Sequence, residues 1–119
     1  MDSILTSIKK LLGIAEEYTQ FDDDIIMHIN SVFTTLTQIG VGPTEGFYIE
    51  DDSAAWTDFV SDLTKIQAIK TYIYLKVRLV FDAASFGSAT LSDYERQIQE
   101  LEWRLNVVAE SDEKGDLDG

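Results

Sequence analysis

The stretch from Ser88 to Val108 constrains the fold of this chain more than any other. Its apolar residues alternate at spacings of three and four over about three heptads, which predicts a helix packed along its length against another helix. They are Leu91, Tyr94, Ile98, Leu101, Leu105 and Val108. Ser88 is suited to cap the helix, and neither glycine nor proline follows before Glu110. Trp103 lies off this seam, so the fold or a partner must cover a second apolar side.

Two further stretches have the spacing of amphipathic helices. Residues Asp22–Ile39 begin with three aspartates, which the helix dipole favours at an N-terminus, and Gly40 ends the pattern. Residues Asp58–Phe81 present an apolar face over more than half of the helix circumference. The segment Tyr72–Phe81 is rich in β-forming residues and admits a strand, but the helical spacing carried on from Leu63 favours a helix.

The rest of the chain before the third long helix predicts a short first helix, a long loop and a helical turn. Asp2 or Ser3 caps a short helix that carries Ile4, Ile8, Leu11 and Leu12 and ends at Gly13. Residues 40–53 are rich in turn formers and predict a long exposed loop with aromatic residues at its base. A helical turn over residues 54–60, capped by Asp52 or Ser53, follows the loop. The aromatic residues expected to seal the loop base are Phe47, Tyr48, Trp56 and Phe59.

The predicted fold is all-α, a small bundle of three to four helices in one domain, residues 1–108. Between the second and third helices lies the long loop. Residues 109–119 hold one large apolar side chain among many acidic ones, which predicts a flexible acidic tail.

The net charge is −13, from 22 acidic and 9 basic residues. Such a surface repels phosphate backbones and disfavours ordinary nucleic-acid binding. Either the charge serves solubility, or it is used to bind basic partners or to line a passage through which nucleic acid slides. The chain begins without a signal peptide and lacks a run of apolar residues long enough to cross a membrane, which predicts a cytoplasmic protein.

Catalytic and metal-binding patterns are missing from the sequence. There is no cysteine, and the single histidine, His28, has no partners for zinc or for a catalytic triad, so we interpret it as structural. The run Asp22-Asp23-Asp24 lacks the alternating ligands and glycine of a calcium loop, so it indicates helix capping. We therefore expect no enzyme activity, no cofactor and no metal.

In element order and in several segments, the chain resembles the head-to-tail connector (adaptor) proteins of long-tailed double-stranded DNA phages. The segments that carry the resemblance are residues Ile4–Ile14, Phe21–Gly46, Lys70–Asp82 and Tyr94–Asn106. The connection Asp82–Gly87 departs from the family pattern, since such proteins often have prolines there. The resemblance implies a non-enzymatic subunit of a ring, commonly of twelve copies, beneath the portal protein in the neck of the virion. It also implies assembly in the host cytoplasm, contact with tail-side stopper proteins, and DNA passing through without specific binding.

Three groups of candidate contact residues follow. Excess apolar surface on the last two long helices suggests a subunit interface at Tyr72, Tyr74, Leu79 and Trp103. The resemblance implies that the C-terminal region docks on the portal, at Glu110, Ser111, Asp112, Glu113 and Lys114. It also implies a loop contact with a neighbour or the next tail component, at Pro43, Thr44, Glu45 and Phe47.

Two other functions stay open from the residues alone. An acidic DNA mimic would occupy a DNA-binding protein, but its acids should form regular surface rows, whereas here they cluster at helix starts, in the loop and in the tail. A small helical enzyme or regulator should show a polar constellation, and the sequence presents none.

Overall fold

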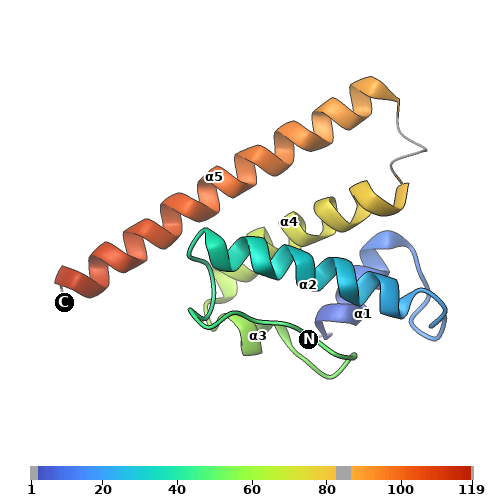
Figure 1. The fold of residues 1–119 in the computed structure, drawn as a ribbon, viewed down its shortest axis with the longest axis horizontal. Coiled ribbons are helices and arrows are strands. Elements are labelled where there is room, and N and C mark those ends of the chain that lie inside the picture. The colour runs from blue at the N-terminus through green and yellow to red at the C-terminus, as the bar shows by residue number, and fades with distance from the viewer. Residues whose placement is uncertain (1–2, 83–86, 119) are drawn as a thin grey trace.

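The computed structural model describes residues 3–82 and 87–118. Within them the chain forms five helices and no strand: α1 (Ile4–Leu12), α2 (Asp22–Gln38), α3 (Trp56–Phe59), α4 (Leu63–Asp82) and α5 (Ser88–Asp118) (Figure 1). The predicted all-α fold is confirmed, with more helices than the three to four expected. The segment Tyr72–Phe81, for which a strand was the alternative, is helical.

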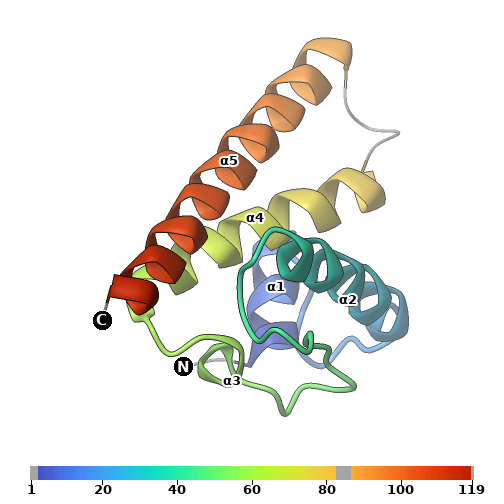
Figure 2. The same cartoon turned by 60° about the vertical axis from the view of Figure 1, so that its left-hand side comes forward.

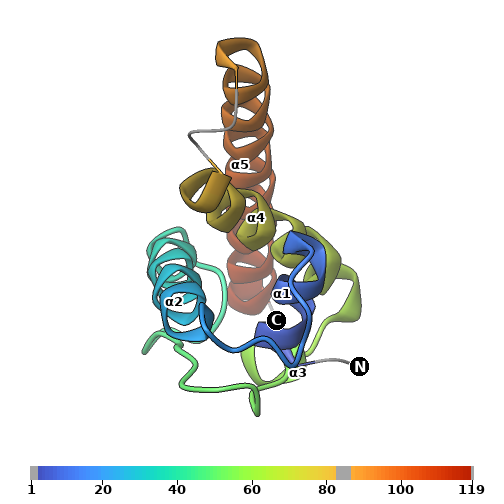
Figure 3. The same cartoon turned by 90° about the vertical axis from the view of Figure 1, so that its right-hand side faces the viewer.

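Helix α4 lies in the middle of the molecule. Helices α1 and α2 pack on one side of it and α5 on the other, as the end view shows (Figure 3). Helices α4 and α5 come close near the start of α4 and diverge toward the connection between them (Figure 2). Most of this connection, predicted as a hinge at Asp82–Gly87, lies outside the described residues.

The short helix α1 is the most enclosed element. Every residue from Ile4 to Lys9 is buried, because α2, α4 and the α3 region surround the helix. Its ends match the sequence prediction. Ser3 Oγ accepts a hydrogen bond from the Thr6 amide at 3.2 Å, and Gly13 ends the helix in the left-handed conformation at φ 80°.

Helix α2 buries one apolar stripe against this centre and begins where the three aspartates predict. The buried residues are Ile25, Ile29, Val32, Phe33 and Leu36. The aspartates occupy the first helical turn, where the dipole favours them, but the N-cap position is Phe21 and no side chain caps the helix. The predicted capping by an aspartate is therefore corrected: Asp22 lies inside the helix and pairs with Lys9 instead.

The long loop after α2 is fastened to the helices at its middle. The side-chain amide of Asn30 donates to the Ile49 carbonyl at 2.9 Å, and its oxygen accepts from the Ile49 amide at 2.7 Å. At the loop base, the ring of Phe47 packs against Phe33 and Phe59, with centroids 5.0 and 5.2 Å apart. Tyr48 was expected to share this role, but it is 67% exposed, so this part of the prediction is wrong.

The helical turn predicted over residues 54–60 is confirmed as α3, and the helix predicted from Asp58 to Phe81 begins later, as α4 at Leu63. Helix α3 is a short turn whose Trp56 is buried and donates its indole N–H to Ser7 Oγ of α1 at 3.1 Å. Its cap is Ala55, whose amide donates to Asp58 Oδ2, and neither Asp52 nor Ser53. The chain then becomes extended at Val60, and the Asp62 carboxylate accepts from the Thr64 amide to start α4.

Helix α5 follows the predicted seam and continues beyond it. Ile98 and Leu105 are buried, while Tyr94 and Leu101 pack partly buried against the core. The predicted end at Val108 is corrected, since the backbone stays helical through Asp118. No proline interrupts it, and the first glycine within it is Gly115. The flexibility of residues 109–119 in solution stays a prediction.

Candidate functional site

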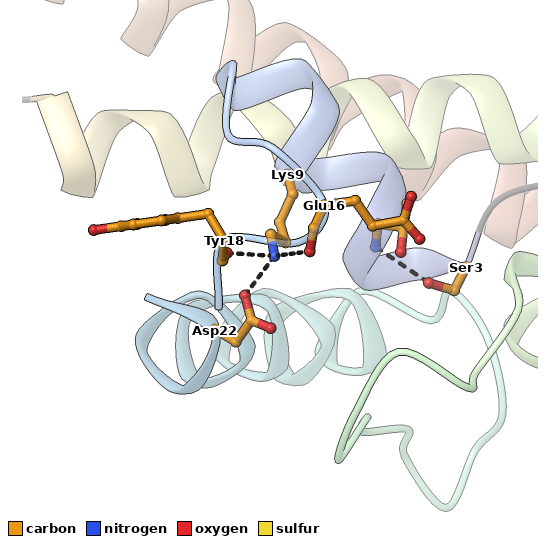
Figure 4. A network of polar contacts seen from close by, with 6 residues as sticks. Ser3, Lys9, Glu16, Tyr18 and Asp22 are labelled. Carbon is orange, nitrogen blue, oxygen red and sulfur yellow. Dashed lines mark hydrogen bonds and ion pairs between the residues drawn. The ribbon is translucent and has the colours of Figure 1, made fainter. Parts of the chain in front are cut away.

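A buried lysine fastens the connection between α1 and α2 (Figure 4). Lys9 Nζ donates to the Glu16 carbonyl at 2.9 Å and to the Tyr18 carbonyl at 2.7 Å, and lies 2.8 Å from Asp22 Oδ1. Only 3% of the Lys9 side chain is exposed. Two hydrogen bonds and one ion pair therefore hold the ammonium group, and together they tie the connection to α1 and to the start of α2.

A polar contact joins the exposed edge of the α4–α5 seam. The hydroxyl of Tyr72 on α4, which is fully buried, donates to Glu102 Oε1 on α5 at 2.8 Å. Lys76 Nζ lies 3.9 Å from the same oxygen. Burial, and then the hydrogen bond to Glu102 and its charge, raise the pKa of Tyr72 well above its ordinary value. Tyr72 is therefore a neutral donor that fixes the register of the two helices.

Further along the seam, one arginine joins two tyrosines. The guanidinium of Arg78 donates to the Tyr74 hydroxyl, and it lies 5.8 Å from the centre of the Tyr94 ring on α5. Cation–π contacts of this geometry contribute about 0.5–1 kcal/mol when partly exposed. Much of the polar and aromatic surface of Tyr74 is thus used within the chain.

The opposite side of α5 carries an exposed tryptophan. Trp103 is 68% exposed, and Gln99 and Val107 lie one turn before and after it, also exposed. Beside them, the Glu100 and Arg104 side chains pair at 2.6 Å. The three residues at i, i+4 and i+8, which we call the α5 stripe, form an uncharged surface in an acidic chain.

A groove lies where the loop after α2 meets α4 and α5. It has a volume of 440 Å³ and is lined by residues that include Gly42, Pro43, Phe59, Ser61, Lys65 and Leu105. Gly42 has a positive φ of 87°, and a Cβ there would lie 2.3 Å from the Phe59 ring. Only glycine fits this position, because the backbone must approach the ring closely. The turn residues are evident in the sequence but the groove is not, because its walls come from segments far apart in the chain.

The residues predicted for a subunit interface are not equivalent in the structure. Tyr72 is enclosed within the chain, so it offers no surface to a neighbour in this arrangement. Tyr74 and Leu79 are partly buried against the core. Trp103 has the free apolar surface that the sequence predicted. The sequence did not predict the structural role of Lys9, because a lysine at a helix end is usually a charged residue on the surface.

The other predicted contact residues divide into loop and tail. Thr44 and Glu45 are exposed at the loop tip, Pro43 lines the groove, and the Phe47 ring faces inward to the two other phenylalanines. The backbone of residues Glu110–Lys114 forms part of the last turns of α5. In Figure 1 this end of α5 extends past the other helices.

Across residues 3–82 and 87–118, no group of three or more histidine, aspartate or glutamate side chains could hold a metal ion. In the same part of the chain, no helix combines the length and apolar character needed to cross a membrane. His28 packs edge-on against Phe81, with ring centres 5.5 Å apart.

These observations describe a small helical protein that presents to solvent the α5 stripe, a groove, a loop tip and a projecting helix end. Residues 4–112 match the model of the family described as phage connector protein, and the chain belongs to this family. This is a structural family, and membership gives the chain a role in connecting the head of a phage to its tail. No curated protein and no solved structure matches the chain.

Proposed function

We propose that this chain is the subunit of a ring beneath the portal, commonly of twelve copies, in the neck of the virion. The ring extends the DNA channel, helps to retain the packaged genome and provides the docking face for the tail-side stopper. The family match over residues 4–112 carries this proposal. It covers all five helices except the last turns of α5.

The charge of the chain supports a role in DNA passage. At −13, a ring of such subunits repels the phosphate backbone, so that DNA slides through without adhering to the wall. Assembly takes place in the host cytoplasm, and no cofactor or reaction takes part.

The exposed surfaces supply the contacts that this role needs. Trp103 belongs to the subunit contact. The loop tip at Thr44 and Glu45 faces a ring neighbour or the next tail component. The last turns of α5, from Glu110 to Lys114, dock on the portal.

A phage that lacks this protein tests the proposal. Its heads should fill with DNA but fail to join tails, so that lysates contain separate heads and tails by electron microscopy. Expression of the wild-type chain in the host should restore tailed particles, and purified particles should then contain it by mass spectrometry. Normal tailed particles in the absence of the protein would refute the proposal.

Two deletions separate the portal contact from the tail contact. Removing residues 110–119 should leave the helix content nearly unchanged and reduce attachment to portal-containing heads. Removing the loop tip, residues 44–46, should leave that attachment intact and impair tail joining. If heads retain the first variant as well as the full chain, the docking role of the helix end is wrong.

A further inference from the structure

The α5 stripe and the groove lie on opposite sides of the same helix. Leu105 lines the groove, and Trp103 precedes it by two residues, which places the two side chains about 200° apart around the helix axis. Trp103 therefore cannot reach the groove of its own chain. A second copy can present its Trp103 to that groove.

The groove has the size and lining to receive an indole ring. Its 440 Å³ lies within the range of about 300–1,000 Å³ found for sites that enclose small ligands. Phe59, Pro43 and Leu105 provide an apolar lining, and Asp62 and Lys65 place one charge of each sign beside it. Tryptophan is among the residues that most often anchor protein interfaces, where it fills a pocket of the partner.

Charge further limits which surface a second copy can use. Two chains of −13 repel each other, so their contact needs a surface with little net charge. The α5 stripe of Gln99, Trp103 and Val107 is uncharged, and the adjacent Glu100 and Arg104 neutralise each other. At the groove margin, the opposite charges of Asp62 and Lys65 likewise give no net charge. Neither surface therefore opposes association, although the chain as a whole does.

We propose that the α5 stripe of one subunit inserts Trp103 into the groove of the next. The proposal rests on the ring function above and identifies the two surfaces that form its repeated contact. Because the inserted residue and the groove lie on opposite sides of one molecule, the contact is head-to-tail, the type that closes into rings by rotation. A face-to-face contact of two Trp103 residues would stop at a dimer.

Thiol crosslinking tests this arrangement, because the wild-type chain has no cysteine. The double variant Val107→Cys, Ser61→Cys places one thiol on the stripe and one at the groove, and keeps Trp103. Purified particles that carry it are treated with a short bismaleimide and separated on a denaturing gel. We expect a ladder of covalent oligomers beyond the dimer. Each single variant should give no crosslinked species.

The outcomes separate this inference from the proposed function. Particles that contain the double variant at the wild-type level but give no ladder would overturn the head-to-tail contact and leave the connector role intact. Crosslinked dimers from Val107→Cys alone would show that two stripes meet, which also overturns it. Absence of the wild-type chain from purified particles would refute the connector role itself.

A second measurement avoids engineered thiols. Trp103→Ala should lower the copies incorporated per particle about tenfold, because it removes the inserted side chain from each contact. Tyr48→Ala is the matched control, since Tyr48 is an aromatic residue of nearly equal exposure, 67% against 68%, outside both surfaces. Circular dichroism should show both variants folded. Incorporation of Trp103→Ala at the level of Tyr48→Ala would contradict the proposal.

Discussion

Helix α1 and helix α5 differ in how much of their surface the fold buries. Helix α1 has only nine residues, yet six consecutive residues are buried, including a lysine. Helix α5 has 31 residues, and among its described side chains only Ile98 and Leu105 are buried. The short helix holds the fold together, whereas the long one packs along a narrow seam and leaves most of its surface to solvent or partners.

The polar contacts of α1 are likewise more enclosed than those of α5. Lys9 is enclosed and held by two hydrogen bonds and one ion pair within its own chain. The Glu102 side chain, which joins α5 to α4, is 36% exposed, and its partner Lys76 is 31% exposed. A buried charge is strongly destabilising when its partner is lost, whereas an exposed pair contributes little. The exposed polar contact of α5 therefore contributes less to stability than the enclosed contact of α1.

The largest expected effect is at Lys9. Lys9→Met should lower the free energy of unfolding by about 3 kcal/mol, because the Asp22 carboxylate and two carbonyls lose their donor. Urea denaturation followed by circular dichroism measures this change. Lys10→Met, at the exposed neighbouring position, should change stability by about 0.5 kcal/mol or less. A loss below about 1 kcal/mol in Lys9→Met would show that the fold does not depend on this enclosed contact of α1, which would contradict the contrast drawn with α5.

An intermediate effect is expected on the buried side of α5. Ile98→Ala should destabilise the chain by about 2.5 kcal/mol, since it leaves a cavity at the seam with α4. Ile98→Val should cost only about 1 kcal/mol. The same denaturation experiment gives both values. If the alanine variant is as stable as the wild type, α5 does not pack on α4 in the free protein.

A smaller and pH-dependent effect is expected at Tyr72. Tyr72→Phe removes the hydrogen bond to the Glu102 carboxylate and should cost about 1.5 kcal/mol at neutral pH. The raised pKa means that the folded state keeps the phenol proton at a pH where the unfolded chain, with its ordinary value of 10.0, releases it. The free energy of unfolding of the wild type should therefore fall as the pH rises above 10.0. The stability difference between the wild type and Tyr72→Phe should become smaller over the same range. A difference that is constant from pH 8 to pH 11 would contradict this account.

The smallest effect on stability is expected at Trp103. Trp103→Ala should change the free energy of unfolding by about 0.5 kcal/mol or less, because the side chain is 68% exposed. Its effect should appear only in assembly. A loss above about 2 kcal/mol would show that Trp103 belongs to the core and would remove the contrast between the two helices.

The sequence predicted the helices well because their apolar residues repeat at helical spacing. The seam at Ile98 and Leu105, the caps at Ser3 and Gly13, and the free surface of Trp103 all follow from local pattern. The start of α4 was predicted at Asp58 instead of Leu63, because the apolar spacing continues across the extended residue Val60. The end of α5 was missed because a polar segment can be helical without burying a face.

What the sequence alone determined is the set of helices, the acidic charge and the apolar residues left off the seam, since each depends on residues close together in the chain. Only the tertiary structure decided which helix is enclosed, that Tyr72 faces inward, and that Lys9 pairs with Asp22. It alone formed the groove, whose walls come from the loop after α2, the start of α4 and α5. The physical reason is that helical spacing determines which residues share a face of a helix, but not which element packs against that face. Burial depends on that packing.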